Sequence, residues 1–429
     1  MYLHRASIFD YQQMEEVPDM KCNRFQDRYQ EAEPSICAFI PEENLKDRLL
    51  HDAAELSAGL NSKKELPPLW GLPVAVKDLI HVDGLPTRAG SNLPPEILTS
   101  HEGSLIAALR TQGALFAGKT VTEEFAYHSV IPTRNPHDTE HTPGGSSAGS
   151  AASVAAGICP LAIGTQTLRS LIAPASFCGV VGFKPSYGRV PIDGTIQLSP
   201  SMDTIGFFTQ DIAGLENVAS HLIPRWHSFY SDRKPVLGVP NGVYMSFMFD
   251  EVRQIFEHQL LALAKAGYII CRVDMPWEDS FIAGDAMLRM VQAEMAQVHK
   301  DWFNEYRHLY GDSVKNAIRS GQKIPPDELE HSRRGQLELR LKLEEVRRQQ
   351  GIDIWVSPAQ GGVAPKGFDC TGWSGMTSVW SYAGLPAISI PAAKINGLPL
   401  GFQLIGSFNK DEELLFWADG VGREQGLGN

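Results

Sequence analysis

Two serines lie where the sequence predicts that a helix start and a strand end can meet. The segment 144–149 reads GGSSAG and leads into an alanine-rich stretch closed by Gly157, which predicts a slim apolar helix beginning near Ser146. Residues 161–165 predict a buried strand, and residues 166–170 the turn at its end, which carries Ser170. Helix starts and open turns present unpaired N–H groups, which is the chemistry needed to hold an oxyanion.

A third element, upstream of both serines, carries a lysine. Residues 71–78 read GLPVAVKD, a β-branched strand that ends on Lys77. A lysine at the end of an apolar strand is costly unless it is paired, exposed or used. The usual lysine pKa is about 10.4, and burial lowers it, so a buried lysine can act as a base near neutral pH. A GGSS turn alone is typical of a structural cap, and the lysine is what favours nucleophilic catalysis.

The chain resembles the amidase signature family, and the resemblance covers most of the sequence from about residue 30 onward. It is carried by eight ordered stretches, which are GLPVAVKDLIHVDGLPTRAGS (71–91), ALFAGKTVTEEFAY (114–127), PGGSSAGSAASVAAG (143–157), GTQTLRS (164–170), PASFCGVVGFKPSYGRVP (174–191), SMDTIG (201–206), YAGLPAISIPA (382–392) and GLPLGFQLIG (397–406). So many matches in order are far more specific than any one motif.

The resemblance implies a Ser–cis-Ser–Lys triad. Lys77 matches the family's lysine, Ser146 its cis-serine and Ser170 its nucleophile. The implied chemistry is acyl transfer through an acyl-enzyme on Ser170, with Lys77 as base through Ser146 and with no metal or cofactor. The backbone N–H groups of the segment Thr167–Leu168–Arg169–Ser170 are expected to form the oxyanion hole.

Two departures from the family pattern bear on the substrate. The family has small residues before the nucleophile, where this chain has Leu168 and Arg169. These side chains either point away from the pocket, or narrow it and disturb the oxyanion hole. The family also carries an arginine two or three residues after the nucleophile, and those positions here are Ile172 and Ala173. The missing arginine favours a neutral substrate. Arg169 could instead supply a positive charge from a displaced position.

Four further positions are predicted to contact the substrate, and they are Gly144, Gly145, Tyr127 and Trp373. For Tyr127 and Trp373, packing in the core is an equally good interpretation. Asp203, in the SMDTIG stretch, is expected to brace neighbouring loops by hydrogen bonds.

Composition excludes several classes of function. The net charge of −12 comes from intermixed acids and bases with no basic run, which argues against nucleic-acid binding. No apolar run reaches about 18 residues, so a membrane span is not expected. The N-terminus lacks a secretory pattern and the six cysteines form no CxxC motif, which favours a cytoplasmic enzyme with reduced thiols. The 13 histidines show no metal-binding spacing.

The alternation of predicted strands and helices indicates a single α/β domain of 429 residues, and the resemblance implies a mixed, twisted central sheet with helices on both faces. We expect an N-terminal helical arm at 1–62, a catalytic core at 63–279 and 351–429, and a helical insertion at 280–350. The insertion is a cap over the pocket, a solvated layer or a dimer face, and the chain is a monomer or homodimer.

These observations predict a serine hydrolase that cleaves C–N bonds of neutral amides, anilides or carbamates (urethanes), with possible ester hydrolysis. Two alternatives stay open at this point. One is a glutaminase-type subunit of an amidotransferase, which requires a partner that accepts ammonia. The other is a non-catalytic relative that binds amides, with its oxyanion hole disrupted by Leu168 and Arg169.

Overall fold

A single mixed sheet runs through the molecule and carries the predicted site. The computed structural model describes residues 3–13, 18–59 and 66–426. Within them the strand order is β2-β1-β3-β5-β4-β9-β10-β8-β6-β7. The strands are β1 (Pro73–Lys77), β2 (Leu115–Thr120), β3 (Leu161–Gln166), β4 (Val181–Lys184), β5 (Thr204–Thr209), β6 (Val236–Pro240), β7 (Ile269–Val273), β8 (Ile354–Pro358), β9 (Ala387–Ile395) and β10 (Leu398–Ile405). β1 pairs in parallel with β2 and β3, whereas β3, β5, β4, β9, β10 and β8 pair antiparallel in turn.

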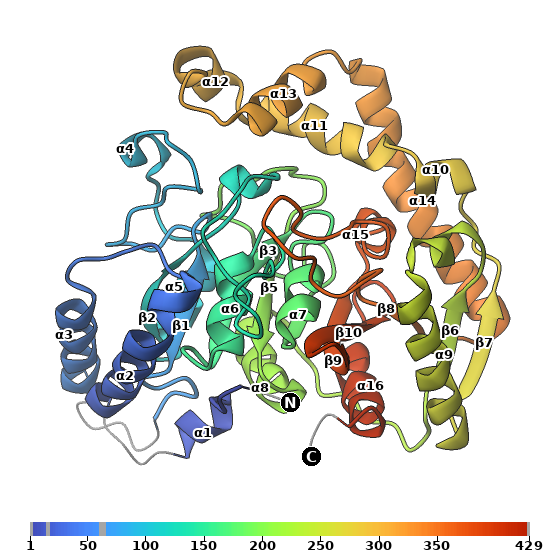
Figure 1. Cartoon of the computed structure of the whole chain (residues 1–429), viewed down its shortest axis with the longest axis horizontal. Coiled ribbons are helices and arrows are strands. Elements are labelled where there is room, and N and C mark those ends of the chain that lie inside the picture. The colour runs from blue at the N-terminus through green and yellow to red at the C-terminus, as the bar shows by residue number, and fades with distance from the viewer. Residues whose placement is uncertain (1–2, 14–17, 60–65, 427–429) are drawn as a thin grey trace.

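Helices cover both faces of this sheet, which confirms the predicted fold class (Figure 1). One face packs against α2 (Pro18–Ile36), α3 (Leu45–Ala58), α6 (Ala148–Ala155) and α7 (Ile172–Cys178). The other packs against α5 (Ser104–Thr111), α8 (Ile212–Leu222) and α16 (Asp411–Glu424). The remaining helices of the sheet layer are α1 (Ile8–Gln12), α4 (Pro95–Leu98), α9 (Asp250–Lys265) and α15 (Ser378–Tyr382).

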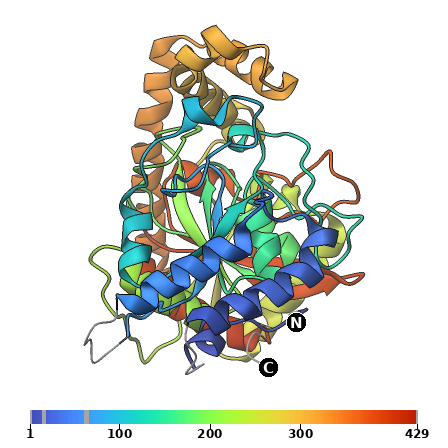
Figure 2. The same ribbon diagram turned by 90° about the vertical axis from the view of Figure 1, so that its left-hand side faces the viewer.

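Which core a strand residue joins follows from the alternation of side chains between the two faces of the sheet. Val74 and Val76 join the core beneath α5 and α8, while Ala75 between them belongs to the core beneath α6. Small residues on the α6 side let that helix lie close to the sheet. α2 and α3 lie side by side across the N-terminal edge of the molecule (Figure 2). The expected boundary between arm and core, at residues 62 and 63, lies outside the described residues.

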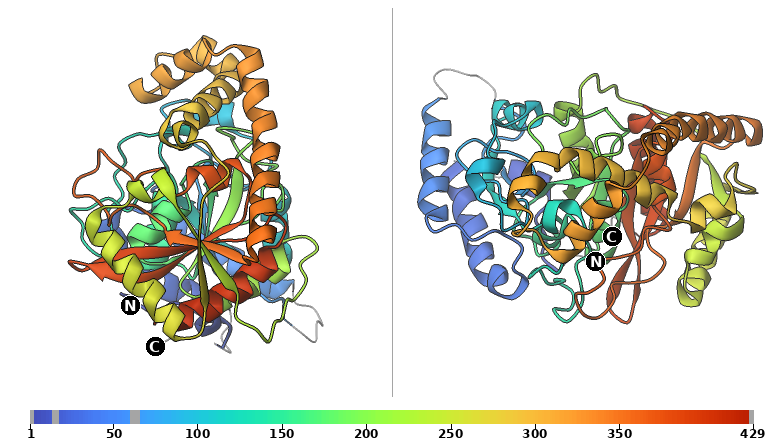
Figure 3. Two further views of the ribbon diagram at one scale, coloured as in Figure 1. Left: turned by 90° about the vertical axis from the view of Figure 1, so that its right-hand side faces the viewer. Right: turned by 90° about the horizontal axis from the view of Figure 1, so that it is seen from above.

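Five helices form a layer that begins above one end of the sheet, and the last of them, α14, continues down one side of it (Figures 1 and 3). They are α10 (Asp279–Ala283), α11 (Ala286–Val298), α12 (Lys300–Tyr306), α13 (Asp312–Gly321) and α14 (Pro326–Gln350). Glu294 of α11 is fully buried and accepts hydrogen bonds from the hydroxyl of Ser199 and from the backbone N–H of Ser201, and it also pairs with Arg333 of α14. Glu124 accepts from the N–H of Gly311, before α13, at 3.0 Å. Two buried carboxylates therefore fasten α11 and the start of α13 to the core.

Within the described residues, none of the helices has the length and apolar character needed to cross a bilayer. The same residues contain no group of three histidine, cysteine, aspartate or glutamate side chains placed to hold a metal ion.

Candidate active site

Lys77, the last residue of β1, points into the interior beside Ser146. Its Nζ donates hydrogen bonds to Ser146 Oγ at 2.7 Å and to Thr165 Oγ1 at 2.8 Å. The side chain is fully buried, and this burial lowers the pKa of Lys77 to about 7, although the carboxylates of Glu123 and Asp203 act in the opposite direction. A lysine with this pKa is neutral in a large fraction of molecules at neutral pH and can accept a proton.

The turn that carries Ser146 is tied to the end of β3. The peptide bond Gly145–Ser146 is cis. Ser147 donates from its hydroxyl to the carbonyl of Thr165 at 3.0 Å and from its N–H to the carbonyl of Ser170 at 3.3 Å. The helix start and the strand end therefore meet, as the sequence predicts, and each brings its serine.

The loop between β3 and α7 is shaped by the side chain of Gln166. Its Oε1 accepts the N–H groups of Leu171 at 2.8 Å and Ile172 at 2.9 Å, and its Nε2 donates to Ser381 Oγ at 2.9 Å. Two amides of the loop are thereby satisfied. The four preceding N–H groups, those of residues 167–170, find no acceptor among the described residues. They are available for an oxyanion.

Ser170 follows these four amides and borders a cavity. Its side chain is largely buried, and its hydroxyl makes no hydrogen bond to Ser146 or to any other described residue. The structure thus brings Lys77 and Ser146 into contact and places Ser170 on the neighbouring loop, which the N–H of Ser147 joins to the Ser146 turn, with the Ser170 hydroxyl free to meet a ligand. Apo geometry of this kind is common where catalytic hydrogen bonds tighten only on substrate binding.

Asp203 braces this arrangement. Its carboxylate accepts the hydroxyl of Thr167 and the N–H groups of Leu198 at 2.7 Å and Ser199 at 2.9 Å. Burial raises the pKa of Asp203 to about 6, against the effect of these hydrogen bonds and of Lys77. Asp203 therefore positions the first residue of the amide-bearing loop.

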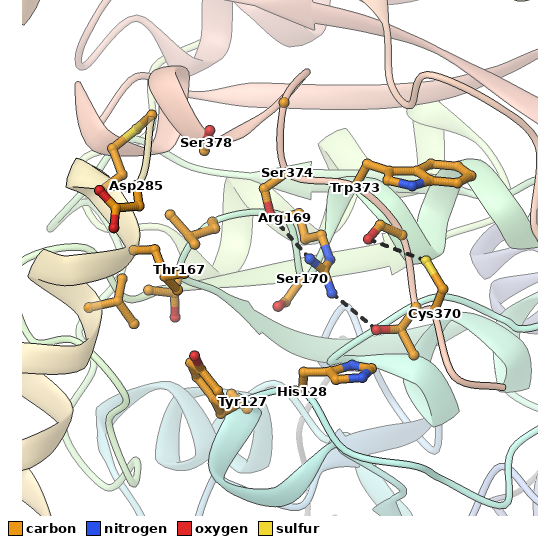
Figure 4. Close-up of a pocket in the computed structure, with 18 of the residues that line it drawn as sticks. Tyr127, His128, Thr167, Arg169, Ser170, Asp285, Cys370, Trp373, Ser374 and Ser378 are labelled. Atoms are coloured by element: carbon orange, nitrogen blue, oxygen red, sulfur yellow. Dashed lines mark hydrogen bonds between the residues drawn. The ribbon is translucent and has the colours of Figure 1, made fainter. Parts of the chain in front are cut away.

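The cavity beside Ser170 has a volume of about 660 Å³ and a largely apolar wall. Tyr127, Thr167 and Ser170 lie around its floor in Figure 4, with residues of α10 and α11 on one side and the loop 369–375 on the other. Its apolar lining residues are Leu168, Leu198, Phe247, Ile282, Met287, Leu288, Val291 and Trp373. Helices far from Ser170 in the sequence therefore form much of the wall.

Leu168 and Arg169 both line the cavity, and the side chain of Arg169 reaches across to its opposite wall rather than pointing away. The guanidinium of Arg169 donates to Ser374 Oγ and to Thr371 Oγ1, both at 3.1 Å (Figure 4). Thr371 in turn donates to the buried carboxylate of Glu123 at 2.7 Å. Arg169 forms no ion pair with any described carboxylate. Arg169 spans from the loop of residues 167–170 to the opposite wall and narrows the cavity, while the four N–H groups of that loop stay unpaired.

The predicted substrate contacts divide into two groups. Tyr127 and Trp373 line the cavity, with the hydroxyl of Tyr127 accepting from Gln292 of α11 at 3.2 Å. Gly144 and Gly145 do not line it, and their N–H groups donate to Thr142 Oγ1 at 3.1 Å and to the carbonyl of Thr371 at 3.0 Å.

Among the polar residues of the cavity that sequence reasoning missed, Glu123 and His128 contact each other; the others are Asp285, Asp369, Cys370, Thr371, Ser374 and Ser378. The Nδ1 of His128 lies 3.3 Å from Glu123 Oε1, and this hydrogen bond raises the pKa of the imidazole. A signal for Glu123 was present, since two adjacent glutamates follow a predicted strand in an apolar context.

The comparisons with known proteins agree on one family. The family model described as Amidase matches residues 22–415. A glutamyl-tRNA(Gln) amidotransferase subunit of Thermus thermophilus is 31% identical over 90% of this chain and 90% of its own length, and the subunit of the same name from Sulfurihydrogenibium sp. is 28% identical over 91% and 90%.

Solved structures give the same result. A crystal structure of an amidase, 29% identical, superposes with a TM-score of 0.86 over 97% of this chain and 99% of that one. A chain from a complex linked to an s-triazine catabolic enzyme, 26% identical, gives 0.83 over 96% of both.

Proposed function

The chain belongs to the amidase signature family, and from that premise we propose that it hydrolyses the C–N bond of a neutral amide, anilide or carbamate through an acyl-enzyme on Ser170. The observation that carries the proposal is the 2.7 Å contact between Lys77 Nζ and Ser146 Oγ, beside a loop with four unpaired amides and a nucleophilic hydroxyl open to an apolar cavity.

The proposed reaction moves one proton along a short relay. Neutral Lys77 takes the proton of Ser146 as Ser146 takes that of Ser170, and Ser170 Oγ bonds to the substrate's carbonyl carbon. The carbonyl electron pair moves to oxygen, where the amides of residues 167–170 stabilise it. When the C–N bond breaks, the proton returns through Ser146 to the leaving nitrogen. Water then attacks the ester by the same relay and releases the acyl group as an acid.

The cavity wall supports a neutral, apolar substrate. Its volume suits a drug-sized molecule, and a wall that is mostly aliphatic and aromatic favours burying an alkyl or aryl group over a zwitterion. In this proposal the helices within residues 280–350 act as a cap, since Ile282, Met287 and Val291 form one side of the cavity. Tyr127 and Trp373 contact the substrate from the core side.

The curated relatives favour a second candidate. The glutamyl-tRNA(Gln) amidotransferase subunits match over about nine tenths of both chains. By that relationship the chain would release ammonia from glutamine for a partner protein. Arg169 would then face the substrate's carboxylate, which would have to displace the hydroxyls of Thr371 and Ser374.

A third candidate is an amide-binding protein without turnover. It is favoured by the bulky residues Leu168 and Arg169 in the cavity wall and by the absence of a hydrogen bond from Ser170 to Ser146 among the described residues.

One substrate panel separates the three candidates. We expect the purified chain to hydrolyse an apolar nitroanilide or aryl carbamate and to leave glutamine intact, with activity absent in Ser170→Ala. Release of ammonia from glutamine, together with co-purification of a second protein, would instead support the amidotransferase. If a fluorophosphonate fails to label the folded protein and no substrate is turned over, the binding protein is the correct assignment.

A further inference from the structure

The long helix α14 has one face that no part of the described chain covers. α14 runs along one edge of the molecule (Figure 3, left), and none of its residues lines the cavity beside Ser170. Its inner face buries Leu329, Leu339 and Leu343, of which Leu339 and Leu343 are about one turn apart and Leu329 lies nearly three turns before Leu339. The opposite face, half a turn away, is exposed along most of the helix.

Six residues form a stripe along this outer face, which we call the α14 stripe. They are Glu330, Arg334, Leu337, Leu341, Glu344 and Arg348, and all six are exposed. Their spacing alternates between four and three residues, which is the spacing of the contact seam in a pair of packed helices. At its centre lie two exposed leucines, Leu337 at 55% and Leu341 at 61% exposed.

Two copies of the α14 stripe are complementary in charge and in apolar positions when they run antiparallel. In an antiparallel pair of α14 helices related by a two-fold axis at position 339, Leu337 faces Leu341 of the second copy. Glu330 then faces Arg348, and Arg334 faces Glu344. A parallel pair in register would set each charge against its own copy, which is repulsive. The order of charges therefore selects one orientation.

Three of the four charges at the two ends of the stripe are unpaired within the chain. The side chains of Glu330, Arg334 and Arg348 make no hydrogen bond or ion pair with any other described residue. Glu344 contacts Arg347 and Ser407, and its side chain is still 47% exposed. Of these four groups, only Glu344 would have to share or give up contacts inside the chain, those with Arg347 and Ser407, to pair with a second copy.

From this symmetry we infer that the α14 stripe is a self-association surface, on which two copies of the chain pair antiparallel about a two-fold axis. The inference does not rest on the proposed function. The seam from residue 330 to residue 348 is about 27 Å long. One helix of this length contributes less than the roughly 800 Å² per partner of a standard interface, so the dimer is concentration-dependent, with dissociation in the micromolar range.

Sedimentation velocity of the full chain at increasing concentration tests the inference through charge reversal. We expect the wild type to shift from monomer to dimer, and Glu330→Arg to weaken the dimer by about tenfold or more because like charges then face each other. The double variant Glu330→Arg/Arg348→Glu restores opposite charges across the axis and should recover dimerisation. Lys342→Glu, also exposed on α14 but beside the stripe, is the matched control and should dimerise as the wild type does.

All substituted residues are exposed and distant from Ser170, so unchanged hydrolysis or an unchanged circular dichroism spectrum reports that each variant is folded. A chain that stays monomeric at several hundred micromolar overturns the inference. So does a dimer that Glu330→Arg leaves intact, because another surface must then hold it.

Discussion

The pH dependence of catalysis tests the role of Lys77 most closely. Burial places the pKa of Lys77 at about 7. Since the proposed base is the neutral amine, kcat/KM for a neutral substrate should rise with pH through about 7 and level off above it. The neutral fraction grows from about 9% at pH 6 to about 91% at pH 8, which predicts roughly a tenfold rise in rate. An unperturbed lysine would still be almost fully charged at pH 8.

A second buried lysine provides the control for this profile. Lys184 is also fully buried with a pKa near 7, but its Nζ donates to the carbonyls of Pro185 and Leu385 and does not line the cavity. Lys184→Met should keep the pH profile, provided it folds, whereas Lys77→Met should lose activity at every pH. A flat profile between pH 6 and 8 in the wild type, or a midpoint that moves in Lys184→Met, would refute the assignment of Lys77 as the base.

Three further predictions follow from the site. Between about pH 7 and 10.5, Lys77 is protonated in the unfolded chain but neutral in the folded one. The buried lysine therefore lowers the free energy of unfolding by about 1.4 kcal/mol for each pH unit that the pH falls within this range. Lys77→Met should resist urea better than the wild type at pH 7. Arg169→Gly should raise turnover of bulky apolar amides severalfold, because its side chain narrows the cavity. Glu294→Ala should lower the free energy of unfolding by about 3 kcal/mol, since it leaves Arg333, Ser199 and Ser201 without their buried acceptor.

Each of these has a contradicting result. Equal urea midpoints for Lys77→Met and wild type at pH 7 would mean that the lysine is not strained by burial. Loss of one whole substrate class in Arg169→Gly would make the guanidinium a recognition group, and the neutral-substrate proposal would fail. If Glu294→Ala unfolds at the wild-type urea concentration, its carboxylate does not fasten α11 to the core.

The central part of the site could be predicted because its signals are local. Three short segments each determine their own local structure within a few residues. They are the β-branched strand that ends in Lys77, the glycine-serine turn before the alanine-rich helix, and the apolar strand that ends near Ser170. The sheet brings these ends together, since β1 and β3 are parallel neighbours. The resemblance then supplied the roles.

The cavity wall could not be predicted in the same way. Ile282, Met287 and Val291 reach the cavity only because α10 and α11 fold back over the sheet, and Met290 and Met295 on the same helix are buried in the core instead. Periodicity gives the apolar side of such a helix but not what it covers. The direction of Arg169 likewise depends on hydroxyls at residues 371 and 374, about two hundred positions away in the chain.

Within the helical insertion, the amphipathic pattern of residues 287–311 contains neither proline nor an internal glycine, yet the structure divides it. α11 ends at Val298 and α12 begins at Lys300. His299 between them is fully buried, with Nδ1 at 3.0 Å from the hydroxyl of Tyr310, and its ring lies 4.4 Å from that of Phe125. A tertiary contact of this kind interrupts the helix without leaving any break signal in the sequence.

The account depends on a covalent bond to Ser170, and mass spectrometry of the intact protein measures that bond directly. After a brief incubation with a slowly deacylated aryl carbamate, we predict a single adduct that maps to the peptide containing Ser170 and is absent in Ser170→Ala. The adduct should form about tenfold more slowly at pH 6 than at pH 8, as the charge on Lys77 requires. Turnover of the same carbamate by Ser170→Ala at the wild-type rate, or an adduct on another residue, would contradict the account.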